Sequence, residues 1–163
     1  MIVVLMGVSG SGKTTIGKLL AERTGAIFAD ADDYHPAANK QKMAAGTPLT
    51  DSDRAPWLET LNGLLRGWFA EGKSGVLACS ALKAAYRDTL ANGMPQGTVS
   101  FCLLDVPRAV LEQRLQGRHH EFMSAKLLDS QLATLEAPTD AVVVENDRPE
   151  DAVVTEILQR LQR

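Results

Sequence analysis

The chain has 163 residues, of which 45% are hydrophobic and 23% charged, with a formal net charge of −3 and a pI near 5.6. This length suits one domain with a sizeable core and is short for two. The acidic balance argues against a general nucleic-acid-binding protein, which needs a basic face, and no apolar run approaches the roughly 20 residues of a membrane span.

An apolar strand at residues 2–6 leads directly into the glycine-rich loop Gly7-Val8-Ser9-Gly10-Ser11-Gly12-Lys13-Thr14. Two glycines separated by four residues and followed by Lys and Thr form the Walker A pattern of a phosphate-binding loop. Small residues let backbone N–H groups approach phosphate oxygens, and the helix beginning near Gly12 directs its positive end at them. We predict that Lys13 contacts the β- and γ-phosphates of ATP and that the Thr14 hydroxyl binds Mg²⁺. The predicted nucleotide contacts in this segment are Gly7, Ser9, Gly10, Ser11, Gly12, Lys13, Thr14 and Thr15.

Further apolar runs predict strands at residues 26–30, 75–80, 98–105 and 141–145. Amphipathic helical stretches separate them, and near-continuous apolar strands are typical of a parallel sheet covered by helices on both faces. We therefore predict an α/β fold, a three-layer α/β/α sandwich with a five-stranded parallel sheet, forming a single domain over residues 1–163. Ligands of such sheets bind at the carboxyl ends of the strands. This rule places four segments near the phosphate loop, beginning at Asp30, Ser80, Asp105 and Glu145.

Three carboxylates, Asp30, Asp32 and Asp33, come at the end of the second predicted strand. Phosphoryl transfer from ATP uses carboxylates to hold Mg²⁺ and to accept the proton of the attacking hydroxyl. Asp30 and Asp32 are two positions apart, so in an extended segment their side chains point the same way. We assign Mg²⁺ organisation to Asp30 and the role of catalytic base to Asp32. The alternative is that Asp32 or Asp33 only caps a following helix, and for Asp33 we prefer this alternative.

More specific motifs cover most of the remaining chain. The first group is His35-Pro36, Asn39, Lys42-Met43, Gly46, Pro48-Leu49, Asp53-Arg54 and Pro56-Trp57-Leu58. The second group is Cys79-Ser80-Ala81-Leu82-Lys83, Tyr86-Arg87-Asp88, Phe122-Met123, Ser130-Gln131 and Leu135-Glu136-Ala137-Pro138. Together they resemble the bacterial-type gluconate kinases, P-loop kinases of the shikimate- and adenylate-kinase-like type, over residues 2 to 158.

The resemblance implies transfer of the γ-phosphoryl group of ATP to the 6-hydroxyl of D-gluconate, with Mg²⁺. It also implies a homodimer, a substrate-binding segment at about residues 33–60 and a mobile lid at about 114–126. Gluconate carries a carboxylate, which an Arg fork suits, and several hydroxyls. We predict that Arg54, Lys83 and Arg87 supply charge. The predicted hydroxyl contacts are His35, Asn39 and Lys42, beside Asp32 as the base.

Several of these residues have simpler alternative roles. Lys42 and Arg87 fit a solvated helix surface equally well without the family match. Asp51 or Ser52 is predicted to cap a helix. Trp57 and Trp68 are predicted to lie in the core.

The predicted lid is basic. Arg114 and Arg118 lie four positions apart and share a helix face, so we predict that both contact phosphate or adenine and that Arg118 is catalytic; a solvated face is the alternative. The family usually has Gly-His-Phe where this chain has His120-Glu121-Phe122, so we give no role to His119 or His120, and a metal site there is disfavoured. The segment Asn146-Asp147-Arg148-Pro149 is a candidate adenine loop.

Two other functions remain open. Shikimate kinases and nucleoside monophosphate kinases share the core, but the segment from His35 to Trp57 favours gluconate. A regulatory nucleotide switch usually carries Asp-x-x-Gly and Asn/Thr-Lys-x-Asp motifs, which do not occur in this sequence, and the intact Lys13 and Asp32 disfavour a catalytically dead scaffold. No basic segment precedes the first strand, so we expect no signal peptide, a cytoplasmic location, and reduced core cysteines at 79 and 102.

Overall fold

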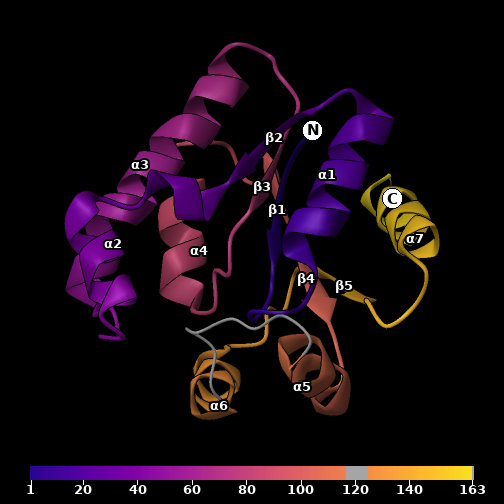
Figure 1. Ribbon diagram of the computed structural model, residues 1–163. Coiled ribbons are helices and arrows are strands. Elements are labelled where there is room, and N and C mark those ends of the chain that lie inside the picture. Colours follow the sequence, from indigo (N-terminus) through magenta and orange to yellow (C-terminus); the bar gives the residue numbers. More distant parts are fainter. Residues whose placement is uncertain (117–124, 163) are drawn as a thin grey trace.

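The computed structural model describes residues 1–116 and 125–162 and contains a five-stranded parallel sheet in the order β2-β3-β1-β4-β5 (Figure 1). The strands are β1 (Ile2–Met6), β2 (Ile27–Asp30), β3 (Gly75–Ala78), β4 (Val99–Asp105) and β5 (Val142–Glu145). The α-helices of the described residues are α1 (Lys13–Thr24), α2 (Ala37–Ala44), α3 (Asp51–Ala70), α4 (Ala84–Ala91), α5 (Arg108–Gln116), α6 (Ala125–Thr134) and α7 (Glu150–Leu161). A short 3₁₀ helix, η1 (Ala31–Tyr34), follows β2. The predicted three-layer sandwich is confirmed, with strand ends that differ from the predicted ones by at most two residues.

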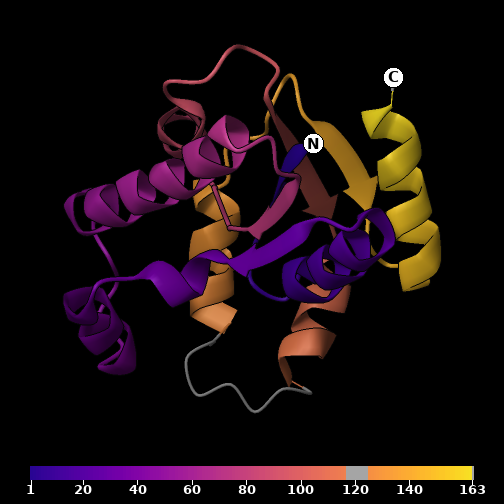
Figure 2. The same cartoon turned by 90° about the horizontal axis from the view of Figure 1, so that it is seen from above.

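Helices cover both faces of the sheet, with α3 and α4 on one side and α1 and α7 on the other (Figures 1 and 2). Side chains of a strand alternate between faces, and β1 is buried along its whole length. Its residues Val4 and Met6 pack in the core beneath α3, whereas Val3 and Leu5 pack beneath α1 and α7. The continuous apolar run of β1 therefore serves two cores at once.

The predicted core tryptophans both lie in the core beneath α3, at 6% exposure for Trp57 and 5% for Trp68. The ring of Trp68 lies against the first residue of β3. A Cβ atom at Gly75 would be 2.2 Å from that ring, so only glycine fits here without a shift of the indole. The close approach fixes α3 against the central strands.

The two cysteines lie on opposite faces of the sheet. Cys79 belongs to the core beneath α3, and Cys102 belongs to the core beneath α1 and α7. Burial raises the pKa of each thiol to about 12. Both side chains therefore act as small core residues.

A third apolar cluster lies at the carboxyl ends of the strands, where α5 and α6 pack (Figure 1). It consists of Val8, Leu82, Val106, Leu111 and Leu128. Val8 belongs to the phosphate loop, Leu82 to the segment between β3 and α4, and Leu128 to α6. This cluster brings the three segments together and so positions the site.

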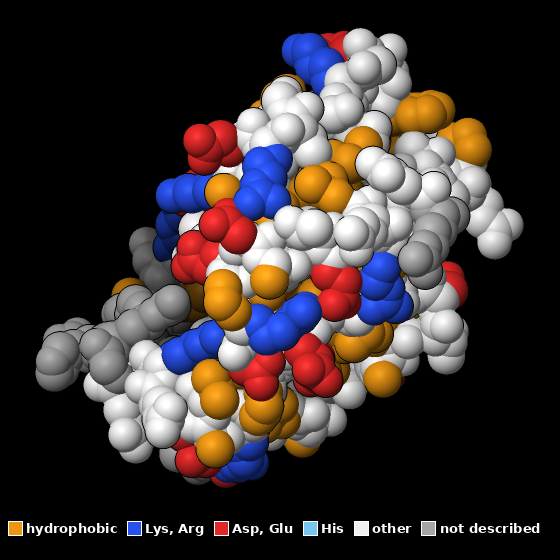
Figure 3. Space-filling model, turned by 90° about the vertical axis from the view of Figure 1, so that its right-hand side faces the viewer, with side chains coloured by type: hydrophobic (Ala, Val, Ile, Leu, Met, Phe, Trp, Pro, Cys, Tyr) orange, Lys and Arg blue, Asp and Glu red, His pale blue; other side chains and the backbone are white. Residues whose placement is uncertain are grey.

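The face covered by α7 carries interspersed charges of both signs (Figure 3). Ion pairs join Arg23 to Asp151, and both Arg148 and Arg160 to Glu156. No helix in residues 1–116 or 125–162 is long and apolar enough to span a membrane.

Candidate active site

The phosphate loop runs from β1 to α1. Gly12 caps α1 in the left-handed region, at φ 93°, and a Cβ atom there would lie 2.4 Å from Nδ2 of Asn146. Glycine is therefore required both by the turn and by this contact. The Lys13 ammonium folds over the loop and donates hydrogen bonds to the carbonyls of Gly7, at 2.9 Å, and Val8, at 3.0 Å. The loop thus holds the predicted phosphate-binding cation against neutral backbone oxygens.

The other predicted nucleotide contacts of the loop, Ser9, Ser11 and Thr15, differ in their exposure and hydrogen bonding. Ser11 is fully buried and its hydroxyl faces Gly7. Its N–H donates to the Val8 carbonyl at 3.2 Å and its carbonyl accepts from the Asn146 amide, so in this structure Ser11 supports the loop, and its contact with a nucleotide stays a prediction. The backbone N–H of Ser9 donates to Oε1 of Gln131, at 2.7 Å, and Nε2 of Gln131 donates back to the Ser9 hydroxyl, at 3.2 Å. Thr15 is exposed on the first turn of α1.

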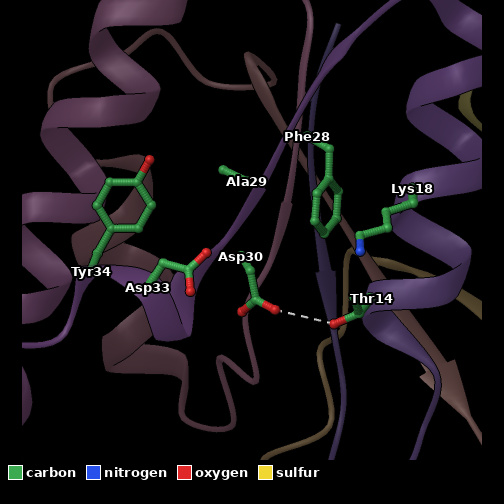
Figure 4. A pocket seen from close by; sticks show the side chains of 7 residues that line it. All are labelled: Thr14, Lys18, Phe28, Ala29, Asp30, Asp33 and Tyr34. Carbon is green, nitrogen blue, oxygen red and sulfur yellow. Dashed lines mark hydrogen bonds between the residues drawn. The ribbon is translucent and has the colours of Figure 1, made fainter. Parts of the chain in front are cut away.

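Thr14 and Asp30 come together as predicted for a metal site, because the Thr14 hydroxyl donates to Oδ2 of Asp30 at 3.2 Å (Figure 4). A pocket of about 330 Å³ opens beside them and is lined by Thr14, Lys18, Phe28, Ala29, Asp30, Asp33 and Tyr34. One hydroxyl and one carboxylate fit Mg²⁺, which prefers oxygen ligands and keeps several waters and phosphate oxygens in its shell. In residues 1–116 and 125–162, no group of three or more His, Cys, Asp or Glu side chains is placed to hold a metal ion. Mg²⁺ at Thr14 and Asp30 would therefore need water or phosphate oxygens as further ligands.

The segment after β2 is not extended. The expectation that Asp30 and Asp32 point the same way because they are two positions apart in an extended chain is therefore wrong. Asp32 lies in the 3₁₀ helix η1, and Asp30, not Asp33, caps that helix by accepting a hydrogen bond from the Asp32 N–H at 3.0 Å. The turn nevertheless keeps the two carboxylates close. Partial burial and then the Asp30 charge raise the pKa of Asp32, while the Lys13 ammonium opposes that rise. A carboxylate of raised pKa near Lys13 has the properties of a general base.

His35 and Asn39 belong to a buried framework. The ring of His35 stacks on Trp57 at 4.1 Å between centroids, and burial lowers the pKa of His35 with help from Arg54 and Lys40. The Asn39 amide donates to the Asp53 carbonyl at 2.9 Å and lies 3.2 Å from Nδ1 of His35. Asn39 is only 3% exposed and its amide nitrogen is bonded within the protein, so in this structure it supports His35, and its contact with an acceptor hydroxyl stays a prediction.

The start of α3 also differs from prediction. Thr50 is the cap, and it forms a capping box with Asp53, whose carboxylate also holds the Lys42 ammonium at 2.9 Å. These bonds lower the pKa of Asp53 to about 2. Asp51, predicted as a possible cap, instead accepts a hydrogen bond from Lys83 at 3.1 Å and another from the Tyr86 hydroxyl.

Two of the three predicted carboxylate-binding cations come together. Arg54 donates to the Tyr86 hydroxyl at 3.3 Å and lies 3.9 Å from the Asp51 carboxylate, which Lys83 also contacts. Arg87 does not join them, because it is 9% exposed and donates to the carbonyls of Ala81, at 2.8 Å, and Glu136, at 2.9 Å. In this structure Arg87 therefore holds the segment between β3 and α4, and its contact with the acceptor stays a prediction.

The segment that follows α6 contributes contacts that the sequence did not reveal. The carboxylate of Glu136 accepts from the N–H of Ala84 at 2.6 Å, and its own N–H donates to the Leu82 carbonyl at 2.8 Å. Together with the contact between Gln131 and Ser9, these bonds link the phosphate loop to the start of α4. Gln131 and Glu136 were noticed only as parts of family motifs.

Arg114 reaches the phosphate loop from α5. Its guanidinium donates to the carbonyls of Gly10, at 3.0 Å, and Asn146, at 2.5 Å, while the Asn146 amide donates to the Ser11 carbonyl at 2.7 Å. Arg148 pairs with Glu156 at 3.0 Å. The predicted contact Arg118 lies outside the described residues, as do His119, His120 and most of the predicted lid.

Comparison with known proteins agrees with this geometry. The family described as an AAA domain matches residues 2–138. The gluconokinase of Gluconobacter oxydans is 44% identical, over 98% of this chain and 90% of its own length. The chain belongs to the gluconokinase family. A gluconokinase structure from Sinorhizobium meliloti superposes with a TM-score of 0.88 at 41% identity, covering 99% of this chain and 91% of that one.

Membership of the gluconokinase family confirms the resemblance seen in the sequence motifs, and an ATP-binding kinase follows from it. The shikimate kinase of Aquifex aeolicus, at 18% identity and a TM-score of 0.65 over 99% of this chain, shows the shared fold alone. Within this gluconokinase fold, the phosphate loop and the segments after β2 and β3 present their polar side chains on one edge of the sheet, as expected for an open α/β sheet.

Proposed function

We propose that this protein transfers the γ-phosphoryl group of ATP to the 6-hydroxyl of D-gluconate, giving 6-phospho-D-gluconate and ADP. One observation carries the proposal. A complete phosphate loop, a carboxylate of raised pKa and a cluster of Arg54 with Lys83 all lie at the carboxyl edge of one sheet. Family membership supports the same substrate, since the relatives are named gluconokinases.

The mechanism assigns a separate task to each group. Asp32 accepts the proton of the 6-hydroxyl as that oxygen attacks the γ-phosphorus. Lys13 leaves the carbonyls of Gly7 and Val8 to neutralise the β- and γ-phosphate oxygens, where negative charge gathers in the transition state. Thr14 and Asp30 would hold Mg²⁺, which supplies charge neutralisation to the transferring phosphoryl group.

The acceptor is positioned by the other half of the site. Arg54 and Lys83 bind its carboxylate, while the neutral His35 and the partly exposed Lys42 are proposed contacts of its hydroxyls. Arg114 is proposed to move from its carbonyl partners to a phosphate of ATP, and Arg118 remains a proposed catalytic contact. We also propose that the protein is a homodimer and is cytoplasmic. Light scattering of the purified protein tests the homodimer.

The deciding experiment measures ADP release from MgATP with three acceptors. These are D-gluconate, D-gluconate that lacks its 6-hydroxyl, and D-glucose. Turnover with gluconate alone is expected, because the reaction requires both the acceptor hydroxyl and the carboxylate. Equal turnover with glucose would reject the carboxylate contact, and turnover of shikimate or a nucleoside monophosphate with gluconate inert would overturn the substrate. Omission of Mg²⁺ tests the metal.

A further inference from the structure

Asp51 lies at the centre of the cationic cluster that faces the acceptor. Its carboxylate accepts hydrogen bonds from Lys83, at 3.1 Å, and from the Tyr86 hydroxyl, and it lies 3.9 Å from the Arg54 guanidinium. These three groups supply the donors that a bound carboxylate needs: an ammonium, a phenol and a guanidinium. The cluster is therefore a carboxylate site whose occupant, in this structure, is a side chain of the protein.

We propose that Asp51 is a built-in substitute for the acceptor carboxylate: it occupies the Arg54–Lys83–Tyr86 cluster in the free protein and is displaced when a sugar acid binds. This inference rests on the proposed function. It adds Tyr86 to the acceptor contacts and makes Asp51 a residue that sets acceptor affinity by competition.

The position of Asp51 favours displacement over a permanent role. Its side chain is 66% exposed, whereas those of Lys83 and Arg54 are 35% and 32% exposed. An exposed carboxylate regains water when it leaves, so its release costs little. Asp51 is also the first residue of α3, where the positive end of the helix continues to stabilise its charge after it turns to solvent.

The charges of the cluster favour a single carboxylate over a more highly charged ligand. Two cations and one carboxylate give a formal charge of +1 while Asp51 is present. When the acceptor carboxylate takes the place of Asp51, the contacts of Lys83 and Tyr86 are kept and one anion replaces another. The bonds from Tyr86 and Lys83 lower the pKa of Asp51, so the cluster stays occupied at neutral pH.

The test compares gluconate binding in the wild type, Asp51→Asn and Asp51→Ala. Removing the competing charge is expected to lower KM for gluconate by about two- to fivefold, the range of an exposed ion pair, with KM for ATP unchanged. D-glucitol, the uncharged analogue with a hydroxymethyl group in place of the carboxylate, should inhibit all three proteins equally. Glu59→Gln, which removes a charge from the exposed side of the same helix, is the matched control and should leave KM unchanged.

Other outcomes overturn the proposal in distinct ways. A rise in KM for gluconate in both Asp51 variants would make Asp51 a ligand or support of the acceptor. An unchanged KM would place the acceptor carboxylate elsewhere. Tyr86→Phe is expected to raise KM for gluconate, and an unchanged value would remove Tyr86 from the site. If the wild type does not turn over gluconate, the proposed function itself fails, which is a separate result from an unchanged KM in the variants. Partial unfolding of a variant lowers the amount of active enzyme and does not lower KM, so a drop in KM cannot be explained by misfolding.

Discussion

The nucleotide half and the acceptor half of the site hold their cations differently. In the nucleotide half, Lys13 and Arg114 donate to main-chain carbonyls. In the acceptor half, Lys42 is bonded to the Asp53 carboxylate and Lys83 to that of Asp51. A carbonyl is a dipole and leaves the cation its full charge, whereas a carboxylate cancels it.

The contrast matches the two ligands. ATP brings several negative charges, so the loop that receives it gains from cations whose hydrogen bonds to backbone carbonyls can be exchanged for bonds to phosphate oxygens. A sugar acid brings one negative charge, and a cluster of partly cancelled charges selects it without attracting larger anions. Lys and Arg side chains thus suit different ligands in the two halves, because backbone carbonyls bind them in one half and carboxylates bind them in the other.

Loss of Lys13 should break the nucleotide half most severely. We expect Lys13→Ala to lower kcat by about 10³-fold, because the lysine neutralises charge that develops on the phosphoryl oxygens. Steady-state kinetics with circular dichroism measures this, and the fold should survive because the hydrogen bonds from the Lys13 ammonium to the Gly7 and Val8 carbonyls join residues of one loop. Lys73→Ala, an exposed lysine far along the chain, is the control. Near wild-type turnover would reject the role of the loop.

The next largest effect should come from Asp32, which acts between the two halves. Asp32→Asn is expected to lower kcat by about 10²-fold or more with little change in KM for ATP. In the wild type the base must be ionised, so kcat should rise with pH through the raised pKa of Asp32 and then level off. The variant should lose this limb of the pH profile. A defect confined to ATP affinity would instead assign Asp32 to the metal.

The smallest expected effect is on the stability of the fold and comes from a change in the acceptor half, at Asp53. The folded pKa of Asp53 is about 2, below the ordinary 3.8, so its bonds stabilise the fold above pH 4 and that contribution is lost as the pH falls towards 2. Asp53→Asn, which weakens the capping box and the pair with Lys42, should lower Tm by a few degrees at neutral pH and by less near pH 2. Thermal unfolding against pH measures this, with Glu22→Gln on α1 as the control. An equal drop in Tm at both pH values would show that the charge of Asp53 is unimportant.

Sequence was sufficient wherever the signal is local. The Walker A pattern depends on eight consecutive residues, and the strands depend on runs of apolar side chains, so both were predicted closely. Asp30 and Thr14, both assigned to Mg²⁺, lie in hydrogen-bond contact because parallel strands bring their carboxyl ends to one edge of the sheet, and the metal itself stays a prediction. The spacing of Asp30 and Asp32 misled because it presumes an extended chain, and a 3₁₀ turn intervenes.

Sequence was insufficient where burial or a distant partner decides a side chain's role. A solvated helix surface was the alternative for Arg87, yet Arg87 is buried and bonded within the protein, as is Asn39. Ser9 and Gln131 are 122 positions apart, and nothing local predicts their contact. Asp51 appeared to be a helix cap because it stands at a helix start, but Thr50 takes that role.

The burial of the two cysteines makes the protein convenient for site-directed labelling. Thiols with a pKa of about 12 remain protonated near neutral pH, and buried thiols are poorly accessible to maleimide dyes. A single new cysteine, for example Glu59→Cys on the exposed side of α3, can then carry a fluorophore in the otherwise native chain. Its emission would follow movement at the acceptor half in real time, separately from phosphoryl transfer.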